Sequence, residues 1–236
     1  MIRSADGLTP FRNTDVLLLS EVKPRRDNLK ENLAKGGFHL AYSDNLDLAI
    51  AVKEGYKVIS TKEYPLTRNG PFKRFLATNR MGRLFGLRNM IVAEIETPTG
   101  EKIKTATLHP VTKPFNRARR KQVRAMGRIL ENFDDDDMLI IGADFNHRPG
   151  PEAADIQVRE QNKLSSVDLQ GKETFIYRLR GQLDDMLYRG KGIQPVNTEV
   201  VDIQSDHRAI ITTFRFQKAQ IGRLQQVPQR ELALAA

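Results

Sequence analysis

Acidic and histidine side chains stand at the ends of several short apolar runs in this sequence. Asp144 and Asn146 follow the run LIIGA, and Asp206 and His207 directly precede RAIITTF. Polar residues at the ends of neighbouring strands can meet at one edge of a sheet. Carboxylate and amide oxygens are the ligands that a hard divalent cation prefers, and an imidazole beside a carboxylate is the usual form of an oriented general base. The pattern predicts a polar site at a sheet edge.

Three further polar residues have the same setting. Glu21 follows DVLLLS, His109 follows KTATL, and Asp184 lies within GQLDDMLY. Each motif alone also has a simpler explanation: a solvated strand end for Glu21, and turns for His109, GADFN and SDH. The acidic run from Asp134 to Asp137 suggests a metal site at first sight. Because it lies between a predicted helix and a predicted strand, we expect a solvated loop there.

The composition restricts the chemistry that the chain can support. The 236 residues include no Cys, which excludes disulfides, thiolate metal sites and a cysteine nucleophile. The net charge of +9 favours polyanionic partners such as nucleic acids, although general solubility explains it equally well. No apolar run reaches the ~18 residues of a membrane span, and the N-terminus has no signal-peptide pattern. We therefore expect a cytoplasmic protein without a membrane span, and we take it to be a monomer.

Short apolar runs joined by turns dominate the chain and predict a β-rich fold. Helices are expected at Arg25–Lys35 and, most clearly, at Phe115–Phe133, where Val123, Met126 and Leu130 repeat at helical spacing. Strands are expected at Asp15–Ser20, Phe38–Tyr42, Leu46–Val52, Tyr56–Ser60, Asn89–Glu96, Glu101–Leu108, Met138–Ile141, Glu173–Tyr177, Leu183–Tyr188, Ile193–Asp202 and Ala209–Phe216. Tight turns between many strands indicate mixed or antiparallel sheets, which favours two packed sheets with helices outside over a doubly wound parallel sheet.

The order of the motifs resembles that of the endonuclease/exonuclease/phosphatase superfamily, which includes deoxyribonuclease-like nucleases. DVLLLSEV, TATLHP, IIGADFN, TF, LDDMLY and SDHRAI follow one another as they do in that family. The resemblance implies an α/β fold, a four-layered αββα sandwich of two mixed, largely antiparallel sheets flanked by helices. The domain would span residues 15–216, between an N-terminal loop (1–14) and a C-terminal tail or peripheral helix (217–236).

The resemblance also implies a metal site and its ligands. Glu21 would be the principal ligand of Mg²⁺ or Mn²⁺. Asp144 and Asn146 would position the attacking water or a phosphate oxygen, with or without a second metal ion. Asp206 would be a further ligand or a neighbour of the phosphate.

The same resemblance assigns roles to the remaining residues of the site. His207 would be the general base or a donor to a phosphate oxygen. Asp184 would hold the ring of His207 in one tautomer, as carboxylates do for imidazoles in catalytic triads. His109 would stabilise or protonate the leaving group.

Two features depart from the family pattern. The family opens with a strand whose Asn helps to bind the metal or phosphate, and this sequence starts too late for it; Asn13 is not its equivalent. We expect the sheet to lack its first strand, which leaves edge groups unpaired, either because the true start lies upstream or because the member is truncated or diverged. Asp185 stands where an aromatic residue or His is common, and strand alternation predicts that it points away from Asp184.

The catalytic motifs do not choose a substrate, so the surrounding residues must indicate it. Residues 61–88 form a long basic segment of little periodicity, and the second predicted helix carries a row of cations. We expect nucleic-acid phosphates to bind Arg74, Arg83, Arg117, Lys121 and Arg124. The phenylalanines between the arginines of the segment would stack on bases or only pack against the domain.

The sequence as a whole predicts a metal-dependent phosphodiesterase. The first hypothesis is a nuclease that acts on DNA or RNA. The alternatives are a phosphatase of a small or lipid phosphate and an inactive nucleic-acid-binding member.

Overall fold

We describe the protein from a computed structural model. The structure describes residues 5–22, 28–43, 47–67, 88–111, 116–146, 151–176, 181–203, 205–217 and 229–235. The helices are the 3₁₀ helix η1 (Ala5–Phe11), α1 (Leu29–Lys35), α4 (Asn116–Leu130) and α5 (Ala153–Gln161). The strands are β1 (Val16–Leu19), β2 (Phe38–Ser43), β3 (Ala49–Lys53), β4 (Lys57–Pro65), β5 (Asn89–Glu96), β6 (Lys102–Leu108), β7 (Leu139–Asp144), β8 (Ser165–Ser166), β9 (Asp184–Arg189), β10 (Ile193–Asp202), β11 (Arg208–Phe216) and β12 (Gln229–Ala235).

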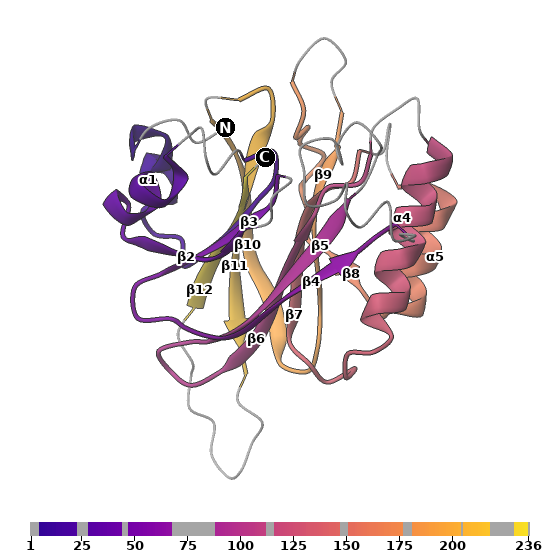
Figure 1. Ribbon diagram of the computed structural model, residues 1–236, viewed down its shortest axis with the longest axis horizontal. Helices are drawn as coiled ribbons and strands as arrows, with labels where there is room; N and C mark the ends of the chain where they lie inside the picture. Colours follow the sequence, from indigo (N-terminus) through magenta and orange to yellow (C-terminus); the bar gives the residue numbers. More distant parts are fainter. Residues whose placement is uncertain are drawn as a thin grey trace, which may run out of the picture.

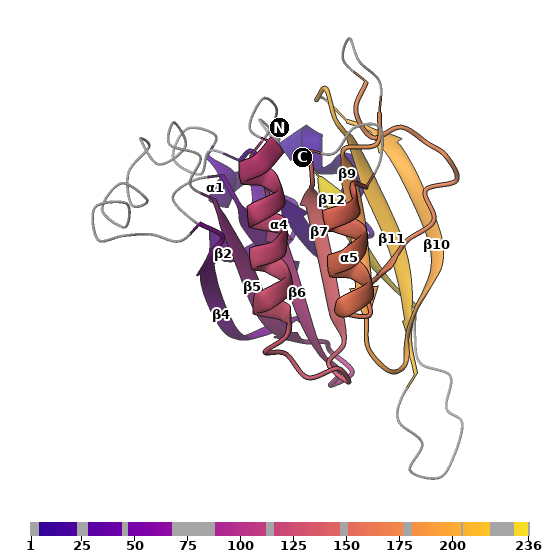
Figure 2. The same ribbon diagram turned by 90° about the vertical axis from the view of Figure 1, so that its right-hand side faces the viewer.

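The strands form two six-stranded sheets that pack face to face. The first sheet has the order β10-β11-β12-β1-β3-β2 and the second the order β4-β5-β6-β7-β9-β8. Strand β1 runs parallel to β12 and β6 runs parallel to β7, while the other described neighbours are antiparallel. Helix α1 covers the first sheet, and α4 and α5 lie side by side over the second (Figures 1 and 2). The predicted four-layered sandwich is therefore confirmed.

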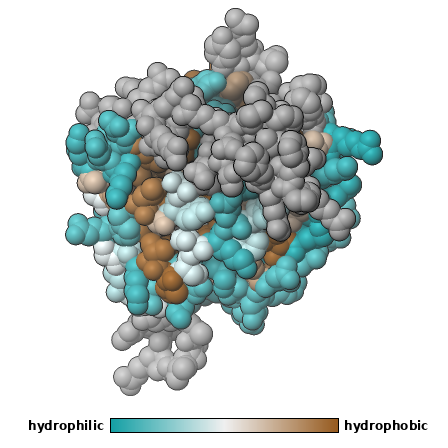
Figure 3. All heavy atoms as spheres, in the orientation of Figure 1, coloured by the Kyte–Doolittle hydropathy of each residue, from teal (hydrophilic) through white to brown (hydrophobic). Residues whose placement is uncertain are grey.

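The layers explain why the strands are continuous apolar runs. The central strands β1 and β7 are covered on both faces, so residues on both sides of them are buried. In β1, Val16 and Leu18 face the core between the two sheets. Leu17 and Leu19 point the other way, into the core beneath α1. The exposed face in Figure 3 is mostly hydrophilic with narrow apolar bands, and no described helix is long and apolar enough to cross a membrane.

The sequence predicts only one of the two helices that cover the second sheet. Helix α4 is the expected amphipathic helix, and Val123, Met126 and Leu130 are buried against the second sheet. Helix α5 was not predicted, because AADIQVREQ shows little apolar periodicity. A capping box fixes its start instead: the carboxylate of Asp155 accepts the backbone N–H of Glu152 at 2.9 Å.

The prediction of a strand at Glu173–Tyr177 is wrong. Residues 173–176 form no strand, and residue 177 lies outside the described residues. Phe175 instead makes isolated bridges with Gly181 and with His207. The segment therefore joins the polar end of the second sheet to that of the first.

Two segments that the sequence predicts to be irregular contain regular elements. Residues 5–11, expected as loop, form η1, whose Phe11 is fully buried in the core beneath α1. The basic segment from residue 61 begins within β4, which continues to Pro65. The expected nucleic-acid contacts Arg74 and Arg83 lie outside the described residues.

The C-terminal segment differs most from the prediction. Residues 229–235, expected in a tail or peripheral helix, form β12 in the middle of the first sheet, between β1 and β11. Leu234 is paired with Leu18 of β1 on one side and with Ile210 of β11 on the other. Strand β1 therefore has neighbours on both sides, and the expectation of an unpaired edge there is wrong.

The position of β12 can be tested with one proline. Proline removes a ladder hydrogen bond and is tolerated only at edges and bulges of sheets. We expect Leu234→Pro to lower the free energy of unfolding by about 3 kcal/mol or more. Val196→Pro is the matched control, because Val196 is exposed at a bulge of the edge strand β10. Equal and small losses in urea unfolding for the two variants would place residue 234 outside the sheet.

Candidate active site

The ends of three strands of the second sheet bring together the polar residues singled out in the sequence. Strands β6 and β7 are parallel, and Leu108 of β6 is paired with Ala143 of β7. The next residues, His109 and Asp144, therefore lie side by side. Strand β9 is antiparallel to β7, and its first residue, Asp184, is paired directly with Asp144. His207 precedes β11 in the other sheet and reaches this edge across the sandwich.

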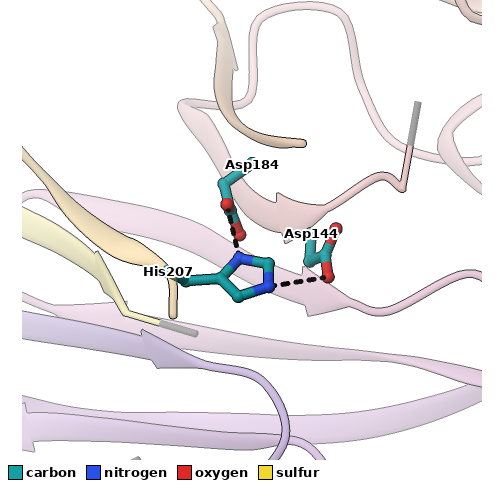
Figure 4. A group of neighbouring side chains, drawn as sticks. All are labelled: Asp144, Asp184 and His207. Carbon is teal, nitrogen blue, oxygen red and sulfur yellow. Dashed lines mark hydrogen bonds and ion pairs between the residues drawn. The ribbon is translucent and has the colours of Figure 1, made fainter. Parts of the chain in front are cut away.

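Asp144 lies at the centre of the resulting cluster (Figure 4). Nε2 of His207 lies 3.9 Å from Oδ2 of Asp144, and Nδ1 of the same ring lies 2.8 Å from Oδ2 of Asp184. Nε2 of His109 lies 3.5 Å from Oδ2 of Asp144, and its Nδ1 lies 3.2 Å from Oδ2 of Asp47. Two imidazoles, each held by its own carboxylate, therefore approach one central carboxylate.

Asp47 is the residue of this cluster that the sequence analysis missed. It precedes the apolar run LAIAV of β3, so it has the same setting as the acid and histidine before β11. Asp47 is 2% exposed, and its carbonyl accepts the backbone N–H of Val22 at 3.0 Å. The hydrogen bond holds the chain after β1, which includes Glu21, beside the cluster.

The TF motif orients the pair formed by His207 and Asp184. The hydroxyl of Thr174 accepts hydrogen bonds from the backbone N–H groups of Leu183 and Asp184, both at 3.0 Å. The ring of Phe175 packs edge-on against that of His207, with 4.9 Å between centroids. The sequence alone assigns no role to this motif.

Burial and charge set the protonation of the central residues. Burial, together with the charge of Asp184, raises the pKa of Asp144 to about 7. Burial lowers the pKa of His207, but its hydrogen bond to Asp184 and the charges of Asp184, Asp144 and Asp206 outweigh burial. The pKa of His207 rises to about 9.

The same balance acts at His109. Burial lowers its pKa, but the hydrogen bond to Asp47 and the charges of Asp144, Asp47 and Glu21 raise it above the ordinary value. Glu21 is exposed and has a left-handed φ of 57°, so its carboxylate acts from the rim of the cluster. Its charge acts on His109, but its carboxylate is not part of the group of Asp144, Asp184 and His207 whose ligand atoms lie close together.

The two remaining predicted ligands also lie at the rim. Asn146 has a φ of 53°; its N–H donates to Oδ1 of Asp144 at 2.9 Å, and its side-chain amide donates to the carbonyl of Pro110 at 3.0 Å. Asp206 is exposed, accepts a hydrogen bond from the hydroxyl of Ser205 at 3.3 Å, and adds its charge near His207.

The donor atoms of the cluster fit a hard divalent cation. Ligand atoms of Asp144, Asp184 and His207 all lie within 4.8 Å of one another. Within the part of the chain that the structure describes, Oδ1 of Asp184 and Nε2 of His109 are buried without a hydrogen-bond partner. Buried polar atoms are normally satisfied, and a bound cation would supply a partner for the Asp184 oxygen, whereas Nε2 of His109 already lies 3.5 Å from Asp144. Two adjacent buried carboxylates also favour a cation between them.

The acidic run from Asp134 to Asp137 is a solvated loop, as predicted. Asp136 lies 2.8 Å from the ammonium group of Lys191, and Asp137 lies 2.7 Å from that of Lys104. Asp135 is paired with Lys163. These ion pairs lie at the surface and account for the acids without a metal ion.

Asp185 points away from Asp184, as strand alternation predicts. Its Oδ2 lies 2.7 Å from Nη2 of Arg159 and 3.1 Å from the hydroxyl of Ser166. Asp185 is buried on the side of the second sheet that α5 covers. It therefore belongs to the packing of α5 and not to the cluster around Asp144.

Several solved structures share this fold at low sequence identity. TDP2 from D. rerio, crystallised with a single strand DNA product, has a TM-score of 0.68 and 19% identity over 89% of this chain and 90% of that chain. The human Nocturnin catalytic domain with a bound sulfate anion has a TM-score of 0.65 and 18% identity over 86% and 80% of the two chains. An endonuclease/exonuclease/phosphatase from Bacteroides vulgatus has a TM-score of 0.66 and 13% identity over 90% and 88%.

This chain therefore has the fold of these solved structures, one of which is an endonuclease/exonuclease/phosphatase, as the motif order predicts. No protein-family model matches the sequence, and no curated protein matches it.

The raised pKa values predict that stability falls with rising pH when divalent cations are absent. The pKa of His207 rises from 6.5 to about 9, so its contribution is complete below pH 6.5 and is lost as the pH rises through 9. This loss amounts to about 3 kcal/mol. The pKa of Asp144 rises from 3.8 to about 7, so its contribution to stability is also lost with rising pH, as the pH rises from 3.8 through 7.

Urea unfolding in EDTA between pH 5.5 and 9.5 measures this slope. Asp184→Asn removes the hydrogen-bonded charge that holds the proton on His207, so we expect a much flatter slope above pH 6.5 in this variant. An identical slope in the wild type and in Asp184→Asn would show that His207 is not the titrating group.

Proposed function

We propose that this protein is a divalent-metal-dependent phosphodiesterase that hydrolyses nucleic acids. The observation that carries the proposal is the pair of carboxylate-bound imidazoles whose Nε2 atoms both face Asp144, His207 with Asp184 and His109 with Asp47. Phosphodiester hydrolysis requires a proton to leave the attacking water and a proton to reach the leaving oxygen. Two oriented imidazoles can serve these two proton transfers.

The residues divide the reaction between them. Asp144 accepts a hydrogen bond from the attacking water and orients it toward phosphorus. Because its pKa is about 9, the neutral form of His207 that can take the proton of this water through Nε2 becomes more abundant as the pH rises, and Asp184 stabilises the imidazolium that forms. His109, held by Asp47, donates its Nε2 proton to the leaving oxygen as the bond to phosphorus breaks. One proton enters and one leaves the two rings in each turnover.

A divalent cation, Mg²⁺ or Mn²⁺, completes the site in this proposal. Glu21, Asp144, Asn146 and Asp206 would hold it: Asp144 ends β7 and Asn146 follows it, while Glu21 follows β1 and Asp206 precedes β11. Such a cation neutralises negative charge that develops on the phosphate oxygens. The buried carboxylates also become less costly when a cation lies between them.

The outer face of α4 supports a nucleic-acid substrate. We call this the basic face of α4: Arg117, Arg120, Lys121, Arg124 and Arg128, all exposed. No ion pair joins these five side chains to any residue within the described ranges. The row is roughly 16 Å long at 1.5 Å per residue, which is enough to follow several phosphates of a strand.

The basic face starts close to the candidate site. Arg119 and Gln122, on the inner side of the same helix turns, contact the loops that follow β6 and β7. The D. rerio TDP2 structure contains single strand DNA, which also favours this substrate class. Arg74 and Arg83 remain part of the proposed interface.

The first test is hydrolysis of supercoiled plasmid and single-stranded oligonucleotides in Mg²⁺ or Mn²⁺. We expect cleavage by the wild type, none in EDTA, and a loss of at least about 100-fold in His207→Ala and Asp144→Ala, because each removes a group needed for proton transfer or water orientation. Asp136→Ala is the matched control, since this surface acid is paired only with Lys191 among the described residues.

The outcomes separate the alternatives. Release of inorganic phosphate from phosphomonoesters, without cleavage of nucleic acid, would make the protein a phosphatase. Binding without turnover in either metal would make it an inactive nucleic-acid-binding member. Cleavage by His207→Ala near the wild-type rate would show that the proposed site is wrong.

The second test measures the salt dependence of substrate binding. Replacing Arg117, Lys121 and Arg124 with Ala should weaken binding and reduce the slope of log K against log salt by roughly two to three, because each phosphate contact releases counterions. Lys163→Ala with Lys191→Ala is the control, since both lysines already neutralise surface acids. An unchanged slope in the α4 variant would exclude this helix from the interface.

A further inference from the structure

Helix α4 presents two buried polar side chains to the loops that carry the candidate site. Arg119 is 0% exposed and Gln122 is 2% exposed. They are three residues apart, so they lie on the same face of the helix. Neither residue stands out in the sequence, since both lie among the exposed cations of α4.

Arg119 binds one end of the peptide group between Phe145 and Asn146. Its Nη1 donates to the carbonyl of Phe145 at 3.1 Å. The N–H of the same peptide group, on Asn146, donates to Oδ1 of Asp144 at 2.9 Å. A peptide group bound at both ends cannot rotate without losing a hydrogen bond, and hydrogen bonds in series strengthen one another. Arg119 therefore fixes the direction from which Asp144 receives this bond.

The fixed peptide matters because the backbone turns sharply at this point. Asn146 has a φ of 53°, in the left-handed region that residues other than glycine seldom occupy. The N–H that donates to Asp144 belongs to the peptide group that leads into this turn, and the side-chain amide beyond it donates to the carbonyl of Pro110. The hydrogen bond from Arg119 to Phe145 stabilises the turn from outside the site.

Gln122 binds a second peptide group in the same manner. Its Oε1 accepts the N–H of Val111 at 2.9 Å. The carbonyl of the same peptide group, on Pro110, accepts a hydrogen bond from the side-chain amide of Asn146 at 3.0 Å. Pro110 directly follows His109, so α4 holds the loop after each of the two site strands, and Asn146 joins the two loops.

Arg119 is itself held rigidly. Its guanidinium makes two 3.0 Å hydrogen bonds to the carboxylate of Asp155 and lies 3.0 Å from Oε2 of Glu152. A fully buried guanidinium carries a desolvation cost that an apolar side chain of similar size would avoid. Orientation of the Phe145 carbonyl explains why an arginine stands here.

We propose that Arg119 and Gln122 are positioning residues for hydrolysis, acting through these two peptide groups on Asp144 and on the loop that follows His109. This inference rests on the proposed function of the site. Neither side chain touches the substrate; both determine the geometry that Asp144 and His109 present to it.

Kinetics separates this role from a contribution to stability alone. In Arg119→Met we expect kcat on bis(p-nitrophenyl) phosphate with Mg²⁺ to fall at least about tenfold while KM stays within about threefold, because orientation is lost but substrate contacts remain. Arg119→Lys should recover part of kcat. Asp155→Asn should retain most of kcat, because it weakens the ion pair but leaves the donor to Phe145.

Arg189→Met is the matched control. Arg189 is also buried, at 4% exposure, and its guanidinium also binds backbone carbonyls, those of Leu130, Phe133 and Asn162. These carbonyls lie at the far end of α4 from the loops after β6 and β7. We expect this variant to lose stability as Arg119→Met does while its kcat stays within about twofold of the wild type.

Amide hydrogen exchange gives a readout that does not depend on activity. The Asn146 amide should exchange much faster in Arg119→Met than in the wild type or in Arg189→Met. If Arg119→Met does not fold, Gln122→Leu gives the same test at the Val111 amide. Unchanged exchange and unchanged kcat in a folded Arg119 or Gln122 variant would overturn the proposal, as would equal effects in Arg189→Met. A wild type without phosphodiesterase activity would reject the proposed function, while exchange would still decide the positioning role.

Discussion

Two carboxylates, Asp144 and Asp184, are paired directly across β7 and β9 in the buried end of the second sheet, and the rest of the site depends on their mutual repulsion. Charges that are close together and poorly solvated destabilise a fold unless other groups neutralise them. The Asn146 N–H, which donates to Asp144, and the ring of His207 between the two acids both stabilise these charges. Such an arrangement is costly for stability alone, which agrees with a site that has a chemical role.

Much of this site follows from the sequence because strand ends and motif order are local features. Asp144, Asp184 and His207 each border an apolar run, and parallel or antiparallel pairing of those runs is enough to bring them together. Asp47 also borders an apolar run, but it lies outside the motifs that resemble the superfamily. Arg119 could not be recognised, since its burial depends on Asp155 of a helix whose own pattern is weak.

The fold shows the same division between local and non-local information. Strand Asn89–Glu96 coincides with its predicted range, because a buried apolar run specifies it without reference to distant residues. Ile193–Asp202 also coincides with its predicted range, although most of its residues are exposed or half-buried. The sequence QRELALA has no strong preference for strand, and it becomes β12 because β1 and β11 offer it backbone partners on both sides. Tertiary context outweighs intrinsic propensity at such positions.

The placement of β12 has a consequence for how the chain folds as it is synthesised. Every other element precedes β12 on the ribosome, yet β12 separates β1 from β11 in the first sheet, with Leu232 beside Val16. Contacts between such distant parts of a chain form slowly. The first sheet therefore closes only after nearly the whole domain has emerged, and until then the facing edges of β1 and β11 are open to pairing with other nascent chains.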